Sequence, residues 1–392
     1  MDRRKLARIA FLLVILGVGF GGHFYLVQAL AIAPAWPAPV RDALVAAIAI
    51  GLAATLARIF LRSRSDVVAS RVLSWSAYVW LGFAFLLLTT TLATSAVFAL
   101  LGAASPAPLD ATLVARSRAF VVGGAALALA ATGLRQGLAF PRVKRIEIAL
   151  DRWPAALDGF RIVQISDVHI GPLLDGRFAR AVTERVNALA PELVAVTGDL
   201  VDGRVARIGA QVEPFRALRA RHGVFFVTGN HDFYSGADAW VEHVERFGWR
   251  ALRNERVAIE ERGACFDLAG VDDVHGNLVE AGAGEDVARA LAGRDASRPV
   301  VLLAHDPATF HRASQNGVDL QLSGHTHGGQ IWPFRYLVRL SVPWVAGLHR
   351  RGASALYVSS GTGFWGPPMR IAAPAEITEI VLRRREESRA SA

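Results

Sequence analysis

The sequence predicts an α/β domain that follows a helical membrane region. Long apolar runs occupy the first third of the chain, whereas apolar strand-like segments alternate with helix-like segments after residue 158. Such alternation is typical of sheets covered by helices. The 392 residues suffice for two domains with separate cores. We expect a transmembrane region of about four helices at 1–140, a linker with a first strand at 141–157, the α/β domain at 158–383 and a disordered tail at 384–392.

Charge and composition separate the two parts. The net charge of +9 is made of +11 within residues 1–145 and −2 within the remainder, so the basic residues accompany the apolar runs. Basic residues beside apolar runs set membrane topology, and they give no case for nucleic-acid binding. Cys265 is the only cysteine, which excludes an intrachain disulfide.

Four apolar runs predict membrane-spanning helices. Each is long enough for the roughly 20 residues that a span requires. The last run is rich in Gly and Ala and is interrupted by Arg135, so a buried or interfacial helix is its alternative. The runs cover Ile9–Val40, Ala43–Leu61, Val72 to about Leu101, and Ala119–Phe140.

Flanking positive charges predict the orientation of these runs. Twelve Lys and Arg residues lie before the first run, around the second loop and around the end of the fourth, against three in the other loops. This asymmetry predicts a multi-pass protein of the inner (cytoplasmic) membrane with a cytoplasmic α/β domain. Arg3-Arg4 makes a cleavable export signal the rival, but three further apolar runs argue against it. If the fourth run does not cross, the α/β domain lies outside.

The α/β domain is predicted from short apolar segments and one amphipathic helix. The helix spans Phe178 to Leu189 and stops before Pro191. A strand within 143–150 leads into the domain. Further strands are expected at Phe160–Ile165, Glu192–Val196, Gly223–Val227, Cys265–Ala269, Pro299–Ala304, Val318–Leu322 and Ala355–Val358.

Five of these strands end in Asp, Asn or His. Singly, such residues are usually turn formers or caps, but five endings in succession predict a shared site at the carboxyl ends of the strands. His325 and His327 are two residues apart, so in an extended backbone their rings would face one small volume. The endings are Asp167-Val168-His169, Gly198-Asp199, Gly229-Asn230-His231-Asp232, His305 and Gly324-His325-Thr326-His327. We assign structural roles to the other histidines, His23, His222, His243, His275, His311 and His349.

These five motifs, in this order and spacing, resemble the calcineurin-like metallophosphoesterase superfamily over about residues 158–383. Gly-His-Thr-His-Gly-Gly-Gln after an apolar amino-terminal region is similar to the transmembrane branch. That branch includes bacterial phosphodiesterases linked to UDP-2,3-diacylglucosamine hydrolysis in lipid A biosynthesis. The resemblance implies a layered α/β/β/α sandwich and a hydrolase that cleaves phosphodiester or pyrophosphate bonds.

The resemblance also implies a binuclear metal centre. Asp167, His169 and His327 would hold one divalent ion, Asn230, His305 and His325 would hold the other, and Asp199 would bridge them. Mixed nitrogen and oxygen ligands favour Mn, Fe or Zn over Ca or Mg. Two ions about 3.5–4 Å apart clamp the attacking and leaving oxygens and activate water as the nucleophile.

His231 is expected to act in catalysis as general acid or charge stabiliser, together with Asp199 and Asn230. Asp232 either orients His231 or simply caps the following segment.

The substrate is expected to be a phosphorylated, lipid-linked small molecule at the bilayer. Residues 331–351 and 364–368 combine aromatic residues with arginines. They predict either a hydrophobic lip that admits an acylated substrate or a loop that covers the core. A non-catalytic membrane sensor is the alternative function, although the complete ligand set argues against it. A transporter is disfavoured because the apolar runs carry few ionisable residues.

Overall fold

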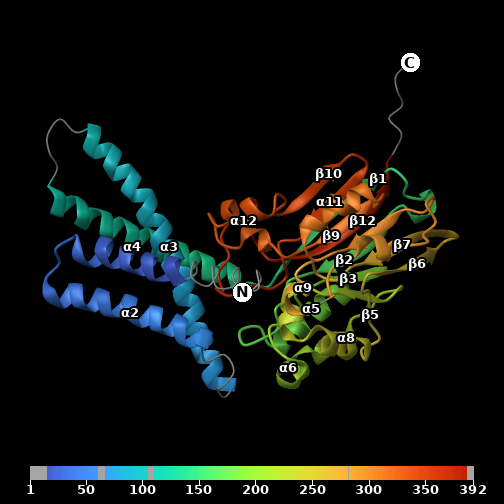
Figure 1. Ribbon diagram of the computed structural model, residues 1–392, viewed down its shortest axis with the longest axis horizontal. Helices are drawn as coiled ribbons and strands as arrows, with labels where there is room; N and C mark the ends of the chain where they lie inside the picture. Colours follow the sequence, from blue (N-terminus) through green and yellow to red (C-terminus); the bar gives the residue numbers. More distant parts are fainter. Residues whose placement is uncertain (1–15, 61–66, 105–109, 281, 386–392) are drawn as a thin grey trace. The chain divides into compact units, whose positions relative to one another are not determined.

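The computed structural model describes residues 16–60, 67–104, 110–280 and 282–385, which form two compact units (Figure 1). A helical unit comprises the chain up to Leu138 together with Gly366–Met369. An α/β unit comprises Ala139–Trp365 together with the chain from Arg370 onward.

Among its described residues, the helical unit contains three helices that are long and apolar enough to cross a membrane. They are α2 (Ala38–Phe60), α3 (Val67–Ala104) and α4 (Ala111–Gly137), so the fourth predicted run is long enough to span. A shorter apolar helix, Leu16–Ile32, ends in the π-helical turn η1 (Val27–Ile32). The start of the first predicted run, at residues 9–15, lies outside the described residues.

Polar side chains in this unit bond to nearby groups, as a lipid environment requires. The Thr91 hydroxyl donates to the carbonyl of Leu87 at 2.6 Å, one turn earlier in α3. Arg58 Nε donates to Ser74 Oγ at 2.8 Å. Asp110 caps α4 by accepting a hydrogen bond from the backbone N–H of Leu113.

The α/β unit is built on two six-stranded sheets. Neighbouring strands of the first sheet are β1 (Arg142–Leu150), β12 (Glu376–Arg384), β2 (Phe160–Ile165), β3 (Leu193–Thr197), β4 (Val224–Val227) and β5 (Arg250–Ala251). Those of the second are β10 (Gly347–Arg351), β11 (Ser354–Val358), β9 (Leu320–Ser323), β8 (Val300–Leu303), β7 (Ala264–Gly270) and β6 (Glu255–Glu261).

Alternating side chains of each sheet fill two core layers. In β2, Phe160 and Ile162 face the layer between the sheets, whereas Val163 and Ile165 face the helices. Phe266 and Leu322 enter the shared layer from the second sheet. Helices α5 (Gly176–Ala188), α6 (Val205–Val212) and α8 (Ala237–Glu245) cover the first sheet, and α10 (Val287–Ala290) and α11 (Phe310–Gln315) cover the second (Figure 1). The predicted α/β/β/α sandwich is confirmed.

Every strand that the sequence predicts is present, with bounds shifted by no more than a few residues. Strands β5, β6, β10 and β12 were not predicted. Strands β6 and β10 carry mostly exposed or half-buried residues, so neither shows a continuous apolar run. Strand β12 lies between β1 and β2, parallel to the former and antiparallel to the latter.

The parallel strands bring the polar segments together. In the first sheet β2, β3 and β4 run parallel, and in the second β7, β8, β9 and β11 do. Parallel neighbours present their carboxyl ends at one edge, which is where the Asp, Asn and His residues follow.

Candidate metal centre

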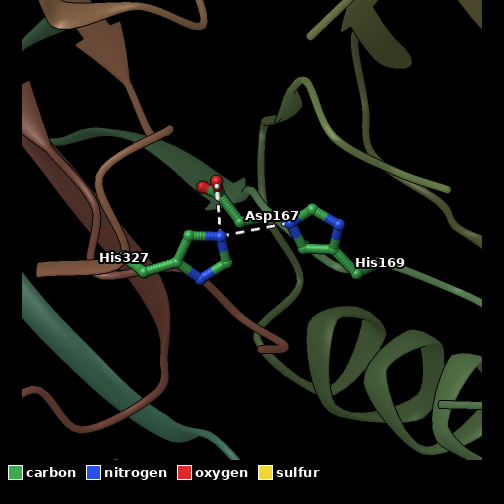
Figure 2. Close-up of side chains that lie close together, drawn as sticks. All are labelled: Asp167, His169 and His327. Atoms are coloured by element: carbon green, nitrogen blue, oxygen red, sulfur yellow. Dashed lines mark hydrogen bonds and ion pairs between the residues drawn. The ribbon is translucent and has the colours of Figure 1, made fainter. Parts of the chain in front are cut away.

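Asp167, His169 and His327 form the first cluster of potential ligands (Figure 2). His327 Nε2 lies 3.3 Å from Asp167 Oδ1 and 3.1 Å from His169 Nε2. The two rings are stacked, with centroids 5.0 Å apart. Two residues come from the loop after β2 and one from the loop after β9, so the cluster joins the two sheets. All three residues are buried.

Asp199, His305 and His325 form a second cluster, and Asn230 adjoins it. His305 Nε2 lies 3.2 Å from Asp199 Oδ2 and 3.3 Å from His325 Nδ1. His325 Nδ1 also lies 3.0 Å from the Asn230 side-chain oxygen. The His305 ring is fixed by its other nitrogen, because Nδ1 donates to the carbonyl of Thr197 at 2.8 Å. A histidine anchored through Nδ1 presents Nε2 to an ion.

Asp199 lies between the two clusters. Its Oδ2 is 3.2 Å from His305 Nε2 and 3.7 Å from His169 Nε2. Its Oδ1 accepts a hydrogen bond from the backbone N–H of His231 at 2.8 Å, which fixes the carboxylate plane. This position is the one that a bridging ligand requires.

Most of these residues adopt left-handed backbone conformations, which non-glycine residues rarely populate. The φ angles of Asp167 and His169 are both 53°, and that of Asp199 is 52°. Those of His325 and His327 are 70° and 50°. Such conformations cost about 1–3 kcal/mol each and concentrate at functional sites. The extended backbone expected at His325 and His327 is wrong, since both are left-handed, but the two residues lie in the adjoining clusters to which the resemblance assigns them.

Glycines permit the close approach of the loops that carry these residues. A Cβ on Gly324 would overlap Ser166 Oγ and Asp167 Oδ2, and one on Gly229 would overlap the Asp199 carboxylate. Gly324 thereby allows the backbone N–H of His325 to donate to Asp167 Oδ1 at 2.9 Å.

The chemistry of these donors fits a pair of divalent transition-metal ions. In each cluster every residue offers one imidazole nitrogen or carboxylate oxygen, and these atoms all lie within 4.8 Å of one another. The nitrogens of His169 and His327 lie 3.1 Å apart, an arrangement that a shared cation stabilises. His327 Nδ1 is buried without a hydrogen-bond partner among the described residues, so the polar contacts of this ring are those of Nε2.

The site holds strongly perturbed titratable groups. Burial raises the pKa of Asp199, but the charges of His305, His231 and His169 outweigh it and hold this pKa well below its usual range. Burial lowers the pKa of His305, but the charge of Asp199 raises it by more, so this pKa lies well above its usual value. Burial and the charge of His169 lower the pKa of His327 well below its usual value, which suits a neutral ligand. Opposed shifts of this kind are typical of functional sites.

His231 lies beside the first cluster and is anchored by a residue that the sequence reasoning missed. Its Nδ1 donates to Asp202 Oδ1 at 2.6 Å, and its ring meets that of His169 edge-on at 4.8 Å. The same Asp202 oxygen lies 3.2 Å from His169 Nδ1. Asp202 lies in the loop after β3, three residues beyond Asp199. The sequence feature that could have identified it is the second acidic residue of Gly198-Asp199-Leu200-Val201-Asp202.

Of the two roles predicted for Asp232, capping of the following segment is confirmed, and no hydrogen bond to His231 is found among the described residues. Asp232 instead accepts hydrogen bonds from three backbone N–H groups, those of Asp199 at 2.8 Å, Leu200 at 3.1 Å and Gly229 at 2.8 Å. It therefore joins the turn after β3 to the start of α7 (Asn230–Ser235). Burial and the nearby Asp199 raise the pKa of Asp232 to about 7.

Arg370 is a second residue missed by sequence reasoning. Its fully buried guanidinium donates only to backbone carbonyls. The acceptors are those of His327 (3.4 Å), Gly361 (3.5 Å), Gly363 (2.6 Å) and Ala373 (2.7 Å). Burial lowers the pKa of Arg370 to about 10. This arginine fixes the backbone behind the first cluster, and a lone Arg in an irregular segment gave no signal of it.

Known proteins match the same region. The family model for calcineurin-like phosphoesterases matches residues 160–329. A zebrafish transmembrane protein with metallophosphoesterase domain is 38% identical over 65% of this chain and 60% of its own length. A metallophosphoesterase of Helicobacter pylori strain J99 is 36% identical over 64% of this chain and 66% of its own length.

A metallophosphoesterase of Aquifex aeolicus is 30% identical over 62% of this chain and 92% of its own length. The chain thus spans about 60% of the length of the zebrafish relative, but nearly all of the bacterial one. Together with the two ligand clusters, this similarity shows that the chain belongs to the family of calcineurin-like metallophosphoesterases.

Proposed function

We propose that this protein is a membrane-anchored phosphohydrolase that cleaves phosphodiester or pyrophosphate bonds at a di-metal centre. The observation that carries the proposal is the position of Asp199 between the two clusters. Asp167, His169 and His327 would hold one ion, Asn230, His305 and His325 the other, and Asp199 both. Two divalent ions (Mn, Fe or Zn) bound there would polarise the phosphoryl oxygens and activate water.

The chain's own residues complete the chemistry. His231 lies against His169 with Nδ1 bonded to Asp202, so Nε2 is free to donate a proton to the leaving oxygen. The Asp202 carboxylate holds the ring in place and favours its protonated form. No covalent protein nucleophile is needed, since bound ions would supply an activated water as the nucleophile.

The exposed segment after His327 supports a lipid-linked substrate. Helix α12 (Arg335–Ser341) buries none of its residues, and Leu337 and Leu340 are 56% and 84% exposed. This exposure favours a hydrophobic lip rather than a loop that covers the core. Trp344, which follows the helix, does pack against the second sheet. We propose that the lip receives the acyl chains of a phosphorylated lipid.

Trp365 connects the lip to the centre. Its ring meets His231 edge-on at 5.3 Å, and its backbone N–H donates to Gln330, three residues after His327. Of the arginines in the lip prediction, Arg350 and Arg351 lie instead on β10, bonded to Ala149 and His311. We therefore assign phosphate recognition to the centre itself. The specific activity that we propose is hydrolysis of a substrate of the UDP-2,3-diacylglucosamine type in lipid A biosynthesis.

The membrane assignment in this proposal rests on α2, α3 and α4 and on the transmembrane name of the zebrafish relative. The distribution of positive charges supports an inner-membrane location with the α/β unit in the cytoplasm.

The test is hydrolysis of bis(p-nitrophenyl) phosphate by full-length protein in detergent, after chelation and titration with Mn²⁺, Zn²⁺ or Mg²⁺. We expect turnover to return with metal, to vanish in Asp199→Ala and to fall about a hundredfold or more in His231→Ala. Protein that binds two ions and hydrolyses neither this ester nor UDP-2,3-diacylglucosamine would contradict the proposal and favour a non-catalytic sensor. Failure to bind any metal would overturn the site assignment as well.

A further inference from the structure

His275 lies beside the second cluster, although only a structural role is predicted for it. It follows β7, whose carboxyl end adjoins that of β8. Its ring is stacked on that of His325, with centroids 5.7 Å apart and an angle of 24° between the planes. His275 therefore borders the half of the centre formed by Asp199, His305 and His325.

The His275 ring is held in one orientation. Asp273 Oδ1 accepts hydrogen bonds from the His275 backbone N–H at 2.8 Å and from its Nδ1 at 2.9 Å. The Asp273 backbone N–H in turn donates to Thr228 Oγ1 at 3.3 Å. Thr228 lies two residues before Asn230, so His275 is tied to a turn that carries a predicted ligand. With Nδ1 engaged, Nε2 is the ring atom that can meet a ligand.

Asp273 is buried, whereas the His275 side chain that it anchors reaches the surface. Asp273 is 1% exposed, and its Oδ2 has no hydrogen-bond partner among the described residues. A buried carboxylate with an unpaired oxygen costs free energy that a purely structural turn does not need. The His275 side chain, in contrast, is 36% exposed, whereas that of His305 is 0% exposed. The pair thus places a fixed imidazole at the accessible rim of a buried centre.

The centre is flanked by two histidines of the same construction. His231 is anchored by Asp202 and meets a ring of the first cluster, and His275 is anchored by Asp273 and meets a ring of the second. A phosphoryl group bound between the clusters has oxygens on both sides.

We propose that His275 is a substrate-binding residue whose Nε2 donates a hydrogen bond to a non-bridging oxygen of the phosphoryl group. This inference rests on the proposed function, because it places a phosphoryl group at the centre. His231 serves proton transfer to the leaving oxygen, whereas His275 serves binding of the group that stays. Such charge-assisted contacts are among the stronger hydrogen bonds.

The test compares His275→Gln with His222→Gln in full-length, Mn²⁺-loaded protein. His222 is a matched control, since its Nε2 lies 2.9 Å from Glu261 Oε2 and it precedes β4, at the end opposite the centre. Calorimetry measures the Kd of inorganic phosphate and the number of Mn²⁺ ions bound. We expect His275→Gln to weaken phosphate binding about tenfold or more, with both ions retained, and His222→Gln to change neither.

The kinetic counterpart is the KM for bis(p-nitrophenyl) phosphate, which we expect to rise about tenfold in His275→Gln with a smaller change in kcat. His275→Ala repeats the test without an amide. Unchanged phosphate affinity in both variants overturns the proposal, and so does loss of an Mn²⁺ ion, which would make His275 a support of His325. Weakened phosphate binding in protein that never hydrolyses an ester supports the contact while contradicting the proposed activity.

Discussion

Asp202 Oδ1 lies 2.6 Å from His231 Nδ1, which makes this carboxylate the anchor of the proposed general acid. The same oxygen lies 3.2 Å from Nδ1 of His169. One carboxylate therefore hydrogen-bonds the proposed proton donor and also lies within ion-pair distance of a predicted metal ligand.

Asp202→Asn removes this charge while keeping the size of the side chain. The neutral amide no longer favours the protonated ring, so we expect kcat to fall about a hundredfold, within the range for general acid catalysis. Steady-state kinetics on bis(p-nitrophenyl) phosphate measure the change. Asp175→Asn, at the N-cap of α5, is the matched control and should leave kcat unaltered. Equal rates in both variants would show that Asp202 does not assist His231.

The pH dependence of stability in chelated protein follows from His231. Burial lowers its pKa, but Asp199 and the hydrogen bond to Asp202 raise it to about 9, above its usual 6.5. The folded state therefore binds this proton more tightly than the unfolded state. The resulting stability is fully present below pH 6.5 and is lost as the pH rises through 9.

We accordingly expect the Tm of the metal-free α/β unit to fall between pH 6.5 and pH 9. Thermal denaturation in chelator at constant ionic strength measures this slope, and His231→Gln should flatten it. A Tm that rises across the same window would contradict the assignment.

Gly324→Ala tests the close approach behind Asp167. The new Cβ would overlap Ser166 Oγ and Asp167 Oδ2, so Asp167 must move away from His327. We expect the bound metal to fall from two ions to one or fewer, as measured by elemental analysis of the purified protein. The control is Gly123→Ala in α4, where a Cβ meets nothing within 4 Å. Retention of both ions in Gly324→Ala would show that the loop adjusts.

Arg370→Met leaves several buried carbonyls without a donor. Unsatisfied buried acceptors cost about 1–3 kcal/mol each, and we expect a total loss of about 3 kcal/mol after relaxation. For a unit of this size the Tm should fall by roughly 10 °C. Differential scanning calorimetry with metal in excess measures it, with exposed Arg180→Met as the control. Arg370→Lys should recover only part of the loss, since Lys donates fewer hydrogen bonds.

Most strands that the sequence predicted are buried on both faces, but burial alone does not explain the outcome, because the largely exposed β1 was predicted and the buried β12 was missed. Strand β3, for example, is an apolar run bounded by Pro191 and Gly198, and its ending pointed directly to Asp199. Strand β6 was missed because its exposed residues make its composition resemble that of a loop. The predicted ligands were identified because each one lies in a short polar motif directly after a predicted strand, and these motifs follow one another along the chain.

The supporting residues could not be predicted in the same way. Asp202, Arg370 and His275 act through contacts between segments that are far apart in the chain, or through burial that only the folded state creates. The left-handed backbone of His325 and His327 was not predicted, because these residues follow an apolar run that is typical of an extended strand.

Strand β12 has a consequence for how the α/β unit is made. It pairs with β1 from Arg142↔Glu376 to Leu150↔Arg384 and lies between strands that are synthesised more than two hundred residues earlier. During translation β1 and β2 therefore wait with unpaired edges, which are templates for aggregation. Pairing at such sequence separation is slow. The sheet whose strands lead to Asp167, Asp199 and Asn230 is therefore completed only once β12 has emerged from the ribosome.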